Sequence, residues 1–436
     1  MIERARDAFI RILRWSEQYT KTDMVYLAQA GWWLNLGVIA TAALSFLLSI
    51  AYANLLPPAT YGLYQYLLSI SGLIATLALP GMNGAVAQAV ARGYEGVMRK
   101  AVRAQLLWMP IPALISIGVA LYYFAHGVTD IGIGLVAIAI LTPLVNVFNT
   151  YAAFLEGKQD FKRGFYLGTI ISVASYGSMF LAILFSKSAA VLIIVNLGVN
   201  LIATIYAYVK TLSTYKPNDK VDPKTIPYGK HLSVLGAVGI LNQFDSILVF
   251  HFLGSVQLAV YSFATLLPER AGGLMNFIGT ASLPRFANQP IEYIRKNILD
   301  KIGRLAFISA IAALAYAAIA PLLFRILFPR YISAIHYTQA FAAIIVFIAV
   351  TNIVNSLLYS KRFTREIYIV GFTQPILLIV LQVPLLIKFG IAGMIAAQLI
   401  TSAVTIALSL WLFFHPLSPK SDLEDAAAIE PEKVQA

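Results

Sequence analysis

The chain has 436 residues, of which 59% are hydrophobic and only 12% charged, and its mean hydropathy is +0.76. Soluble proteins have roughly 45–50% apolar and about 25% charged residues, so this composition excludes a soluble globular protein and indicates an integral membrane protein. The net charge of +12 then marks one side of the membrane rather than nucleic-acid binding, and the lack of cysteine excludes disulfides and Cys-ligated metal sites.

The N-terminal segment, residues 1–30, is expected to lie on the membrane surface. The stretch MIERARDAFIRILRWSEQY is basic and places Ile2, Phe9, Ile12 and Leu13 at helical spacing. It lacks the uninterrupted apolar core and small-residue cleavage site of a signal peptide. We therefore predict a cytoplasmic amphipathic helix, and the alternative is a frayed polar tail.

Apolar segments of the length that crosses a bilayer, about 20 residues, follow at regular intervals. The predicted spans are 31–53, 61–90, 104–124, 131–156, 165–186, 189–210, 231–253, 256–284, 303–324, 335–358, 366–386 and 389–413. Lys and Arg are concentrated in the two termini and in every second connecting loop. The positive-inside rule therefore places both termini in the cytoplasm, with residues 414–436 as a disordered tail.

A long polar linker, residues 211–230, divides the spans into two sets of six, at 31–210 and 231–413. The second set repeats features of the first in the same order. Tyr64 and Tyr261 follow equivalent outer turns. Asn146 and Asn149 in the first set are each separated by the same number of residues from Asn352 and Asn355 in the second. A basic hinge follows each Asn pair, LEGKQDFKRGFY in the first set and LYSKRFTREIY in the second. This order predicts an all-α polytopic protein of about 12 helices in two six-helix lobes around a central cavity.

Three stretches carry a resemblance to a known family. They are SIAYANLLPPATYGLYQYLLSISGLIATLALPGMNGAVAQAVAR (residues 49–92), the hinge FLEGKQDFKRGFY, and LGSVQLAVYSFATLLPERAGGLMNF in the second half. The sequence resembles the polysaccharide-biosynthesis, O-antigen-type flippases of the multidrug, oligosaccharidyl-lipid and polysaccharide exporter superfamily. The resemblance implies a multi-pass transporter of the cell membrane that moves a polyprenyl- or dolichyl-(di)phosphate-linked oligosaccharide to the outer leaflet by alternating access.

Glu269 and Arg270 follow Pro268 inside an apolar span, where a charge is costly unless it has a partner or faces a wet cavity. A guanidinium carries a fork of donors suited to phosphate oxygens, so Arg270 is the first candidate for binding the lipid head group. The alternative is a structural ion pair with Glu269 or Asp245. The same two carboxylates are candidates for coupling to H+ or Na+, and neutral packing is the alternative.

Polar and aromatic side chains in the predicted spans are candidates for binding sugar. They are Asn35, Gln65, Asn83, Asn242, Gln243, Asn276, Tyr64 and Tyr261. The alternative for each amide is a hydrogen bond that joins two helices. Pro80-Gly81 and Pro268 are expected to bend their helices and to let them act as gates.

The sequence contains no His cluster with metal-ligand spacing, no phosphate-binding Gly-rich loop and no Ser-His-Asp arrangement. We therefore expect no cofactor, no metal and no enzyme activity, because the outer loops are also too short for a catalytic domain. The expected partners are the lipid-linked oligosaccharide, membrane lipids and a coupling ion, without nucleic acid, for a monomer. A cation-coupled multidrug antiporter of the same superfamily is the alternative function.

Overall fold

The computed structural model describes residues 24–236, 244–275, 279, 282–283, 286–361 and 363–417, and these form helices joined by short turns, with no strand. The expected amphipathic segment up to residue 23 and the expected tail from residue 418 lie outside the described residues. An all-helical chain is what the apolar periodicity predicts, because a helix satisfies its own backbone hydrogen bonds in lipid. Within these described ranges, eight helices are long and apolar enough to cross a membrane, and a bent pair makes a ninth.

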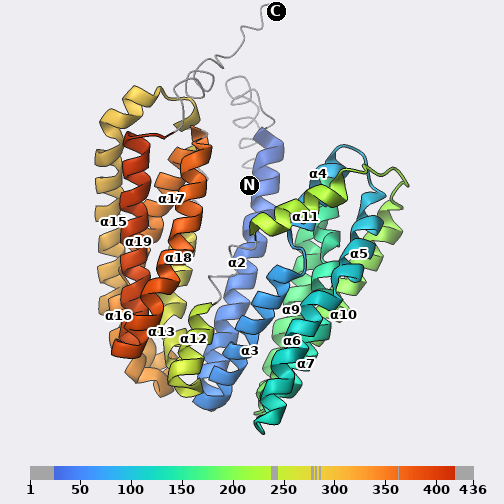
Figure 1. Cartoon of the computed structure of the whole chain (residues 1–436), viewed down its shortest axis with the longest axis horizontal. Helices are drawn as coiled ribbons and strands as arrows, with labels where there is room; N and C mark the ends of the chain where they lie inside the picture. The colour runs from blue at the N-terminus through green and yellow to red at the C-terminus, as the bar shows by residue number, and fades with distance from the viewer. Residues whose placement is uncertain are drawn as a thin grey trace, which may run out of the picture. The chain divides into compact units, whose positions relative to one another are not determined.

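The helices follow one another along the chain as α2 (Met24–Leu55), α3 (Pro58–Leu77), α4 (Gly81–Ala91), α5 (Val97–Trp108), α6 (Pro110–Ala125), α7 (Thr129–Phe148), α8 (Thr150–Gly157), α9 (Phe161–Phe185), α10 (Ala189–Tyr215), α11 (Thr225–Gly236), α12 (Phe244–Leu253), α13 (Ser255–Leu274), α15 (Ile291–Leu327), η2 (Pro329–Ala334), α16 (Ile335–Phe341), α17 (Ile344–Ser360), α18 (Thr364–Phe389) and α19 (Ile391–Phe414). Figure 1 shows their order by colour. The predicted spans at 31–53, 231–253 and 256–284 are described only in part, so the count of twelve stays a prediction.

The chain forms two compact units. Unit 1 contains Met1–Leu55 and Ile70–Ala237, and unit 2 contains Leu56–Ser69 and Val238–Ala436. The division therefore differs from the polar linker in the sequence: α11 belongs to unit 1, and the first half of α3 belongs to unit 2.

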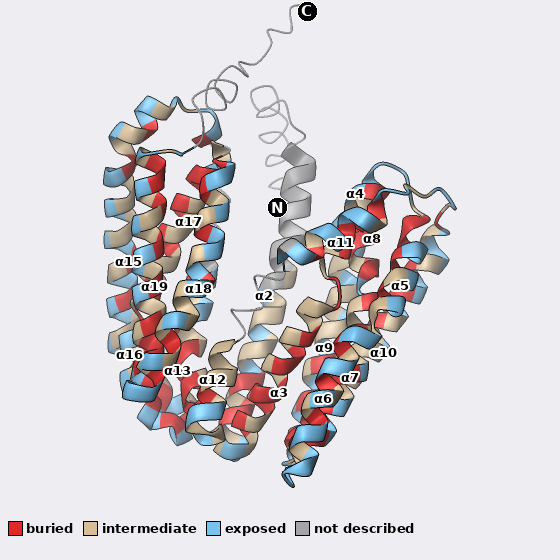
Figure 2. Cartoon of the chain, viewed as in Figure 1, coloured by how far each residue is buried: buried red, intermediate tan, exposed pale blue. Residues whose placement is uncertain are grey.

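Buried residues gather where helices of one unit face each other (Figure 2). Many of the exposed residues are large and apolar. Ile202 on α10 and Leu314 on α15 are each 70% exposed. Such surfaces are costly in water and are expected where a protein contacts hydrocarbon.

In unit 1 the prediction of a bend at Pro80-Gly81 is confirmed, because α3 and α4 meet at 48°. Leu79 at this break has a positive φ of 58°, which is uncommon for a residue with a side chain. Two side chains of α5 donate to carbonyl oxygens at the break: Gln105 Nε2 to Leu79 (3.3 Å) and Trp108 Nε1 to Leu77 (3.0 Å). The carbonyl oxygens of Leu77 and Leu79, at the break between the helices, thus have hydrogen-bond donors from α5.

Helix α11 packs closely against α4 within unit 1 (Figure 1). The backbone N–H of Gly81 donates to Ser233 Oγ at 3.0 Å. A Cβ at Gly81 would lie 2.4 Å from the backbone nitrogen of Ser233, so only glycine permits this approach. The start of the predicted seventh span is therefore fixed to unit 1.

A polar network closes one end of unit 1, which we call the linker end: loop 92–96, turn 157–160 and linker 216–224. Lys158 pairs with Glu95, and the other oxygen of Glu95 accepts the backbone N–H of Asn218 at 2.9 Å. Two further ion pairs, Arg92–Asp222 (3.2 Å) and Arg99–Asp219 (2.9 Å), join the loop and α5 to the linker.

In unit 2 the first half of α3 packs against α13. A Cβ at Gly62 would lie 1.8 Å from the carbonyl oxygen of Ser255, so the two backbones are in contact. The ring of Tyr61 stacks on Phe263 at 4.7 Å, and Phe263 lies 4.1 Å from the ring of Tyr331. This aromatic packing explains why the start of α3 belongs to unit 2.

Candidate functional site

The charged pair of unit 2 lies near the described end of α13. Pro268 is buried, whereas Glu269 and Arg270 are both exposed. Helix α13 continues through Pro268, whereas at Pro80 the chain breaks at Leu79, whose positive φ of 58° interrupts the helix. Helix α13 is not among the described helices that are long and apolar enough to span a membrane, and the predicted span 256–284 is described only in part. Within lipid, a charged side chain is costly unless it meets water or a polar partner.

Arg270 has no ion pair within 4.0 Å among the described residues. Glu269 interacts electrostatically with both Arg270 and Asp245. Adjacent positions on a helix point about 100° apart, so Glu269 and Arg270 cannot meet in one tight pair. With no ion pair to a described residue, the guanidinium has donors that can bind a ligand.

Asp245 on α12 is the centre of a hydrogen-bonded cluster. Its Oδ1 accepts the backbone N–H of Ser246 at 2.6 Å, and its Oδ2 accepts the hydroxyl of Tyr261 at 3.0 Å. The amide Nε2 of Gln398 on α19 donates to the oxygen of Tyr261 at 2.7 Å. Three helices thus contribute to one polar chain around a carboxylate.

A second glutamine lies at the same depth. Asp245 and Tyr261 are nine residues before and seven after the turn at Gly254, and Gln382 and Gln398 are each eight residues from the turn at Gly390. At about 1.5 Å per residue, all four lie roughly 10–14 Å from their turns. A Cβ at Gly390 would lie 3.9 Å from Leu253 Cδ1, so the two turns are neighbours.

Gln382 is fully buried in α18, and neither its amide oxygen nor its amide nitrogen has a hydrogen-bond partner among the residues that the structure describes. An unpartnered amide in the interior costs about 1–3 kcal/mol, so such a group calls for a water or an ion. Sequence analysis missed Gln382 and Gln398. The only available signal was an amide inside an apolar span, and many amides share it.

The other predicted sugar-binding residues are not all brought together. In unit 2, Tyr64 is buried, and Gln65 Nε2 donates to the hydroxyl of Tyr61 at 2.5 Å. In unit 1, Asn83 on α4 has a buried side-chain oxygen without a partner. The side chain of Asn35 and all of Asn242, Gln243 and Asn276 lie outside the described residues.

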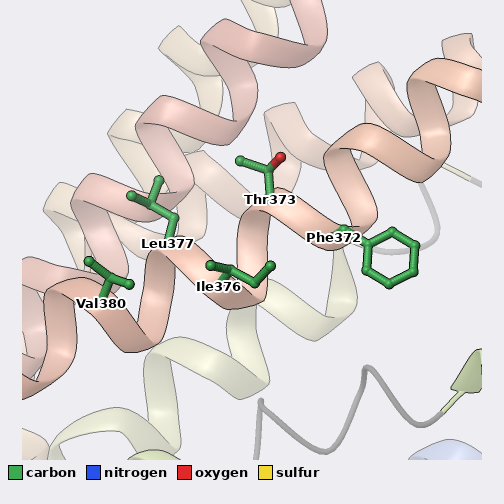
Figure 3. A pocket seen from close by; sticks show the side chains of 5 residues that line it. All are labelled: Phe372, Thr373, Ile376, Leu377 and Val380. Carbon is green, nitrogen blue, oxygen red and sulfur yellow. The ribbon is translucent and has the colours of Figure 1, made fainter.

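A shallow groove of about 310 Å³ runs along α18 and is lined by Phe372, Thr373, Ile376, Leu377 and Val380. Figure 3 shows that all five side chains come from this one helix. The lining is almost entirely apolar, which suits hydrocarbon and not a phosphate or a sugar.

In the described ranges, no group of three or more His, Asp or Glu residues could hold a metal ion. The polar features of unit 2 that bear on the predicted site are the Asp245 cluster, the exposed Arg270 and the buried Gln382.

Residues 27–289, more than half of the chain, match the family described as polysaccharide biosynthesis protein. The chain belongs to this family. No curated protein matches the sequence. The family assignment agrees with the resemblance in the sequence motifs.

Solved structures match the fold of this family member over nearly its whole length. The lipid II flippase MurJ in an inward closed conformation has a TM-score of 0.65 and 13% identity, covering 90% of this chain and 89% of that chain. An inward-facing multidrug resistance MATE family transporter of the MOP superfamily has a TM-score of 0.63 and 14% identity, and the match covers 89% of this chain and 96% of that chain.

A MOP superfamily transporter from Pyrococcus furiosus has a TM-score of 0.56 and 12% identity, covering 89% of this chain and 96% of that chain. At such low identities the likeness shows the fold alone. The chain is therefore a multi-pass, all-helical membrane protein with a fold that flippases and multidrug transporters share.

Proposed function

We propose that the protein is a flippase that moves a polyprenyl- or dolichyl-(di)phosphate-linked oligosaccharide from the cytoplasmic to the outer leaflet of the plasma membrane. It would do so as a monomer, by alternating access. The observation that carries the proposal is the exposed Arg270 in an apolar helix, without an ion pair within 4.0 Å in the described part of the chain. Membership of the polysaccharide biosynthesis family supports a glycan substrate.

Arg270 is proposed to bind the phosphate of the lipid carrier. A guanidinium stays charged at any physiological pH, and its planar fork can donate two parallel hydrogen bonds to phosphate oxygens. Amides and tyrosines would then bind the sugar hydroxyls and faces. Gln65, Asn83, Tyr64 and Tyr261 remain candidates, together with the undescribed Asn35, Asn242, Gln243 and Asn276.

The Asp245 cluster is proposed to couple transport to a cation. A carboxylate that accepts two hydrogen bonds beside a second acid, Glu269, can exchange them for a proton or a sodium ion. The unpartnered amide of Gln382 offers an oxygen ligand at the same depth. In this scheme the site in α12, α13 and α19 supplies the driving force, and Arg270 selects the substrate.

Depletion of the protein in its native host tests the flippase directly. Lipid-linked oligosaccharides extracted from the membranes would be quantified by mass spectrometry. We expect a complete lipid-linked glycan to accumulate while surface glycan falls, and the mass of the accumulated lipid names the substrate. Unchanged glycan lipids would favour the multidrug antiporter instead, and cation-driven efflux would then be measured.

Substitution of Arg270 tests its assigned part. Arg270→Ala removes a charge-assisted hydrogen bond and should reduce glycan export by roughly 10- to 100-fold at normal protein levels. Arg270→Lys keeps the positive charge but loses the planar, two-pronged donor geometry of the guanidinium. Its export rate should therefore lie between those of the wild type and Arg270→Ala. Arg304→Ala is the matched control, because Arg304 is an exposed arginine that pairs with Asp300. Full export by the Ala variant would leave Arg270 with a structural role only.

A further inference from the structure

Two lysines of unit 2 converge on one residue, Gln289, in the turn before α15. Lys361 Nζ donates to the backbone carbonyls of Gln289 (2.7 Å) and Ala287 (3.3 Å). Lys301 Nζ donates to the side-chain oxygen of Gln289 over a long 3.5 Å. We call this region, turn 286–290 with Lys301 and Lys361, the tail end of unit 2.

None of the described acids in this part of unit 2 forms an ion pair with Lys301 or Lys361. Asp300 pairs with Arg304 at 2.7 Å, and the buried Glu366 accepts the backbone N–H of Leu417 at 2.8 Å. Glu292 attracts Lys361 electrostatically but forms no ion pair with it among the described residues. In the described part of the chain neither lysine therefore has an ion pair: Lys361 is held by backbone carbonyl oxygens, and Lys301 by the amide oxygen of Gln289 and the rings of Phe286 and Tyr293, at 5.6 and 5.5 Å from its Nζ.

A partly buried lysine without an ion pair carries a charge that burial disfavours. Partial burial lowers the pKa of Lys361 below its ordinary value, and the attraction of Glu292 offsets only part of that effect. Partly desolvated positive charges are stabilised by an anion placed between them. Arg295, on the same helix as Lys301, adds a third positive charge: its Nη2 donates to the carbonyl of Phe413 at 3.4 Å, and its buried Nε has no hydrogen-bond partner in the described part of the chain.

The same position in unit 1 shows what a satisfied lysine looks like. Lys158 and Lys361 each stand three residues after a buried leucine in the repeated basic hinge, Leu155 and Leu358. Lys158 pairs with Glu95 of the loop before α5, whereas Lys361 meets Gln289 of the turn before α15. An uncharged glutamine takes the place of the acid, and Lys301 adds a second positive charge.

We propose that the tail end of unit 2 is a binding site for the phosphate of a lipid head group, held by Lys301 and Lys361. Lysine is a point-charge donor with three N–H groups, so two of them can hold a phosphate without the fixed geometry of Arg270. The site is distinct from the charged pair of α13 and from the Asp245 cluster. It rests on the proposed function only for the identity of the lipid, which would be the substrate diphosphate.

Binding to the purified full-length protein in a neutral detergent tests the site. The probes are geranylgeranyl diphosphate, dioleoyl phosphatidylglycerol and inorganic pyrophosphate, titrated at about 150 mM salt to screen weak surface attraction. The variants are the double substitution Lys301→Ala with Lys361→Ala, and Lys296→Ala as control. Lys296 is an exposed lysine on the same helix as Lys301.

We expect the double variant to bind geranylgeranyl diphosphate about tenfold more weakly, and Lys296→Ala to stay within about twofold. An equal loss of phosphatidylglycerol binding would identify the ligand as bulk anionic phospholipid and would still support the site. Equal binding by the wild type and the double variant, or no binding of any probe by the wild type, would overturn it.

Gln289→Glu keeps the proposal testable if the double variant does not fold. The new carboxylate should pair with the lysines as Glu95 pairs with Lys158, and so displace the phosphate while preserving the fold. Undiminished binding by this variant counts against the site. These binding experiments measure no transport, so a result against the lysine site does not affect the flippase proposal. Conversely, unchanged glycan lipids after depletion of the protein would not affect the lysine site.

Discussion

The linker end of unit 1 and the tail end of unit 2 contain corresponding lysines with different surroundings. Lys158 pairs with Glu95, which also accepts the N–H of Asn218 in the linker. Lys361 contacts carbonyl oxygens and shares Gln289 with Lys301. The acid Glu95 at one end and the neutral Gln289 at the other accompany an ion-paired lysine in unit 1 and, in unit 2, two lysines without an ion pair among the described residues.

The difference teaches that charge count alone does not identify a binding site in a membrane protein. Both ends are basic in sequence, as the positive-inside rule requires. In unit 1, Asp219 and Asp222 also pair with arginines, so that the linker is fastened to the helices. A ligand is expected only where the structure leaves a charge without its partner.

The largest effect is expected from Gly81→Ala, which would separate the continuation of the linker, α11, from α4. The added Cβ would lie 2.4 Å from the backbone nitrogen of Ser233, and backbone cannot yield as a side chain can. We expect a loss of about 3 kcal/mol, measured by thermal unfolding in detergent. Gly84→Ala is the matched control on the same helix, because its Cβ would meet nothing closer than 3.9 Å. Similar unfolding of both variants would contradict the close contact.

A smaller loss is expected from Glu95→Ala. It leaves Lys158 and the backbone N–H of Asn218 without their acceptor, at a cost of about 2 kcal/mol. Lys361→Ala should lower the free energy of unfolding by less than about 1 kcal/mol, because water can donate hydrogen bonds to the carbonyl oxygens that Lys361 leaves. The two variants are compared by thermal unfolding. Equal losses would mean that Lys361 is as structural as Glu95.

The Glu95 pair should also give unit 1 a pH dependence. Burial raises the pKa of Glu95, but hydrogen bonds from Lys158 and Asn218 and the lysine charge outweigh it, so the net pKa lies below 4.5. The stabilisation is therefore present above 4.5 and is lost as the pH falls through the lowered value. Wild type should unfold at a higher temperature than Glu95→Gln at about pH 7, with the gap closing by about pH 3. A gap that does not change with pH would exclude this ion pair as its source.

The smallest effect is expected from Gln289→Glu, which copies the arrangement of unit 1 into unit 2. A new ion pair at a half-exposed position should stabilise the protein by about 0.5 kcal/mol. Thermal unfolding measures it, with Gln339→Glu as an unrelated control because Gln339 donates its amide to Ala317 at 2.9 Å and should be destabilised. A loss of stability in Gln289→Glu would show that the lysines are already neutralised.

The sequence predicts the helical membrane fold, the bend at Pro80 and the family, because each depends on local composition or on motifs. It does not predict which elements pack together. The linker looks like a flexible boundary, with three prolines, yet Asn218, Asp219 and Asp222 fasten it to unit 1. Those contacts join residues more than a hundred positions apart, where periodicity carries no information.

The candidate site was predicted in part. Asp245, Glu269 and Arg270 stand out because charges are rare in apolar spans, and they do lie in one unit within electrostatic reach. Gln398 and Gln382 do not stand out, since an isolated amide is usually a link between helices. Their relevance appears only from the hydrogen bond to Tyr261 and from the unpartnered buried amide.

The placement of α11 in unit 1 and of the start of α3 in unit 2 constrains any attempt to express the protein as two pieces. A cut in the linker would strip α11 from the Gly81 surface that holds it. A first fragment ending after α11 would keep that contact but leave the aromatic face of Tyr61 without Phe263 and Tyr331. The predicted halves of the sequence thus differ from the two compact units, and we expect a fragment cut at the linker to lose one of these two contacts.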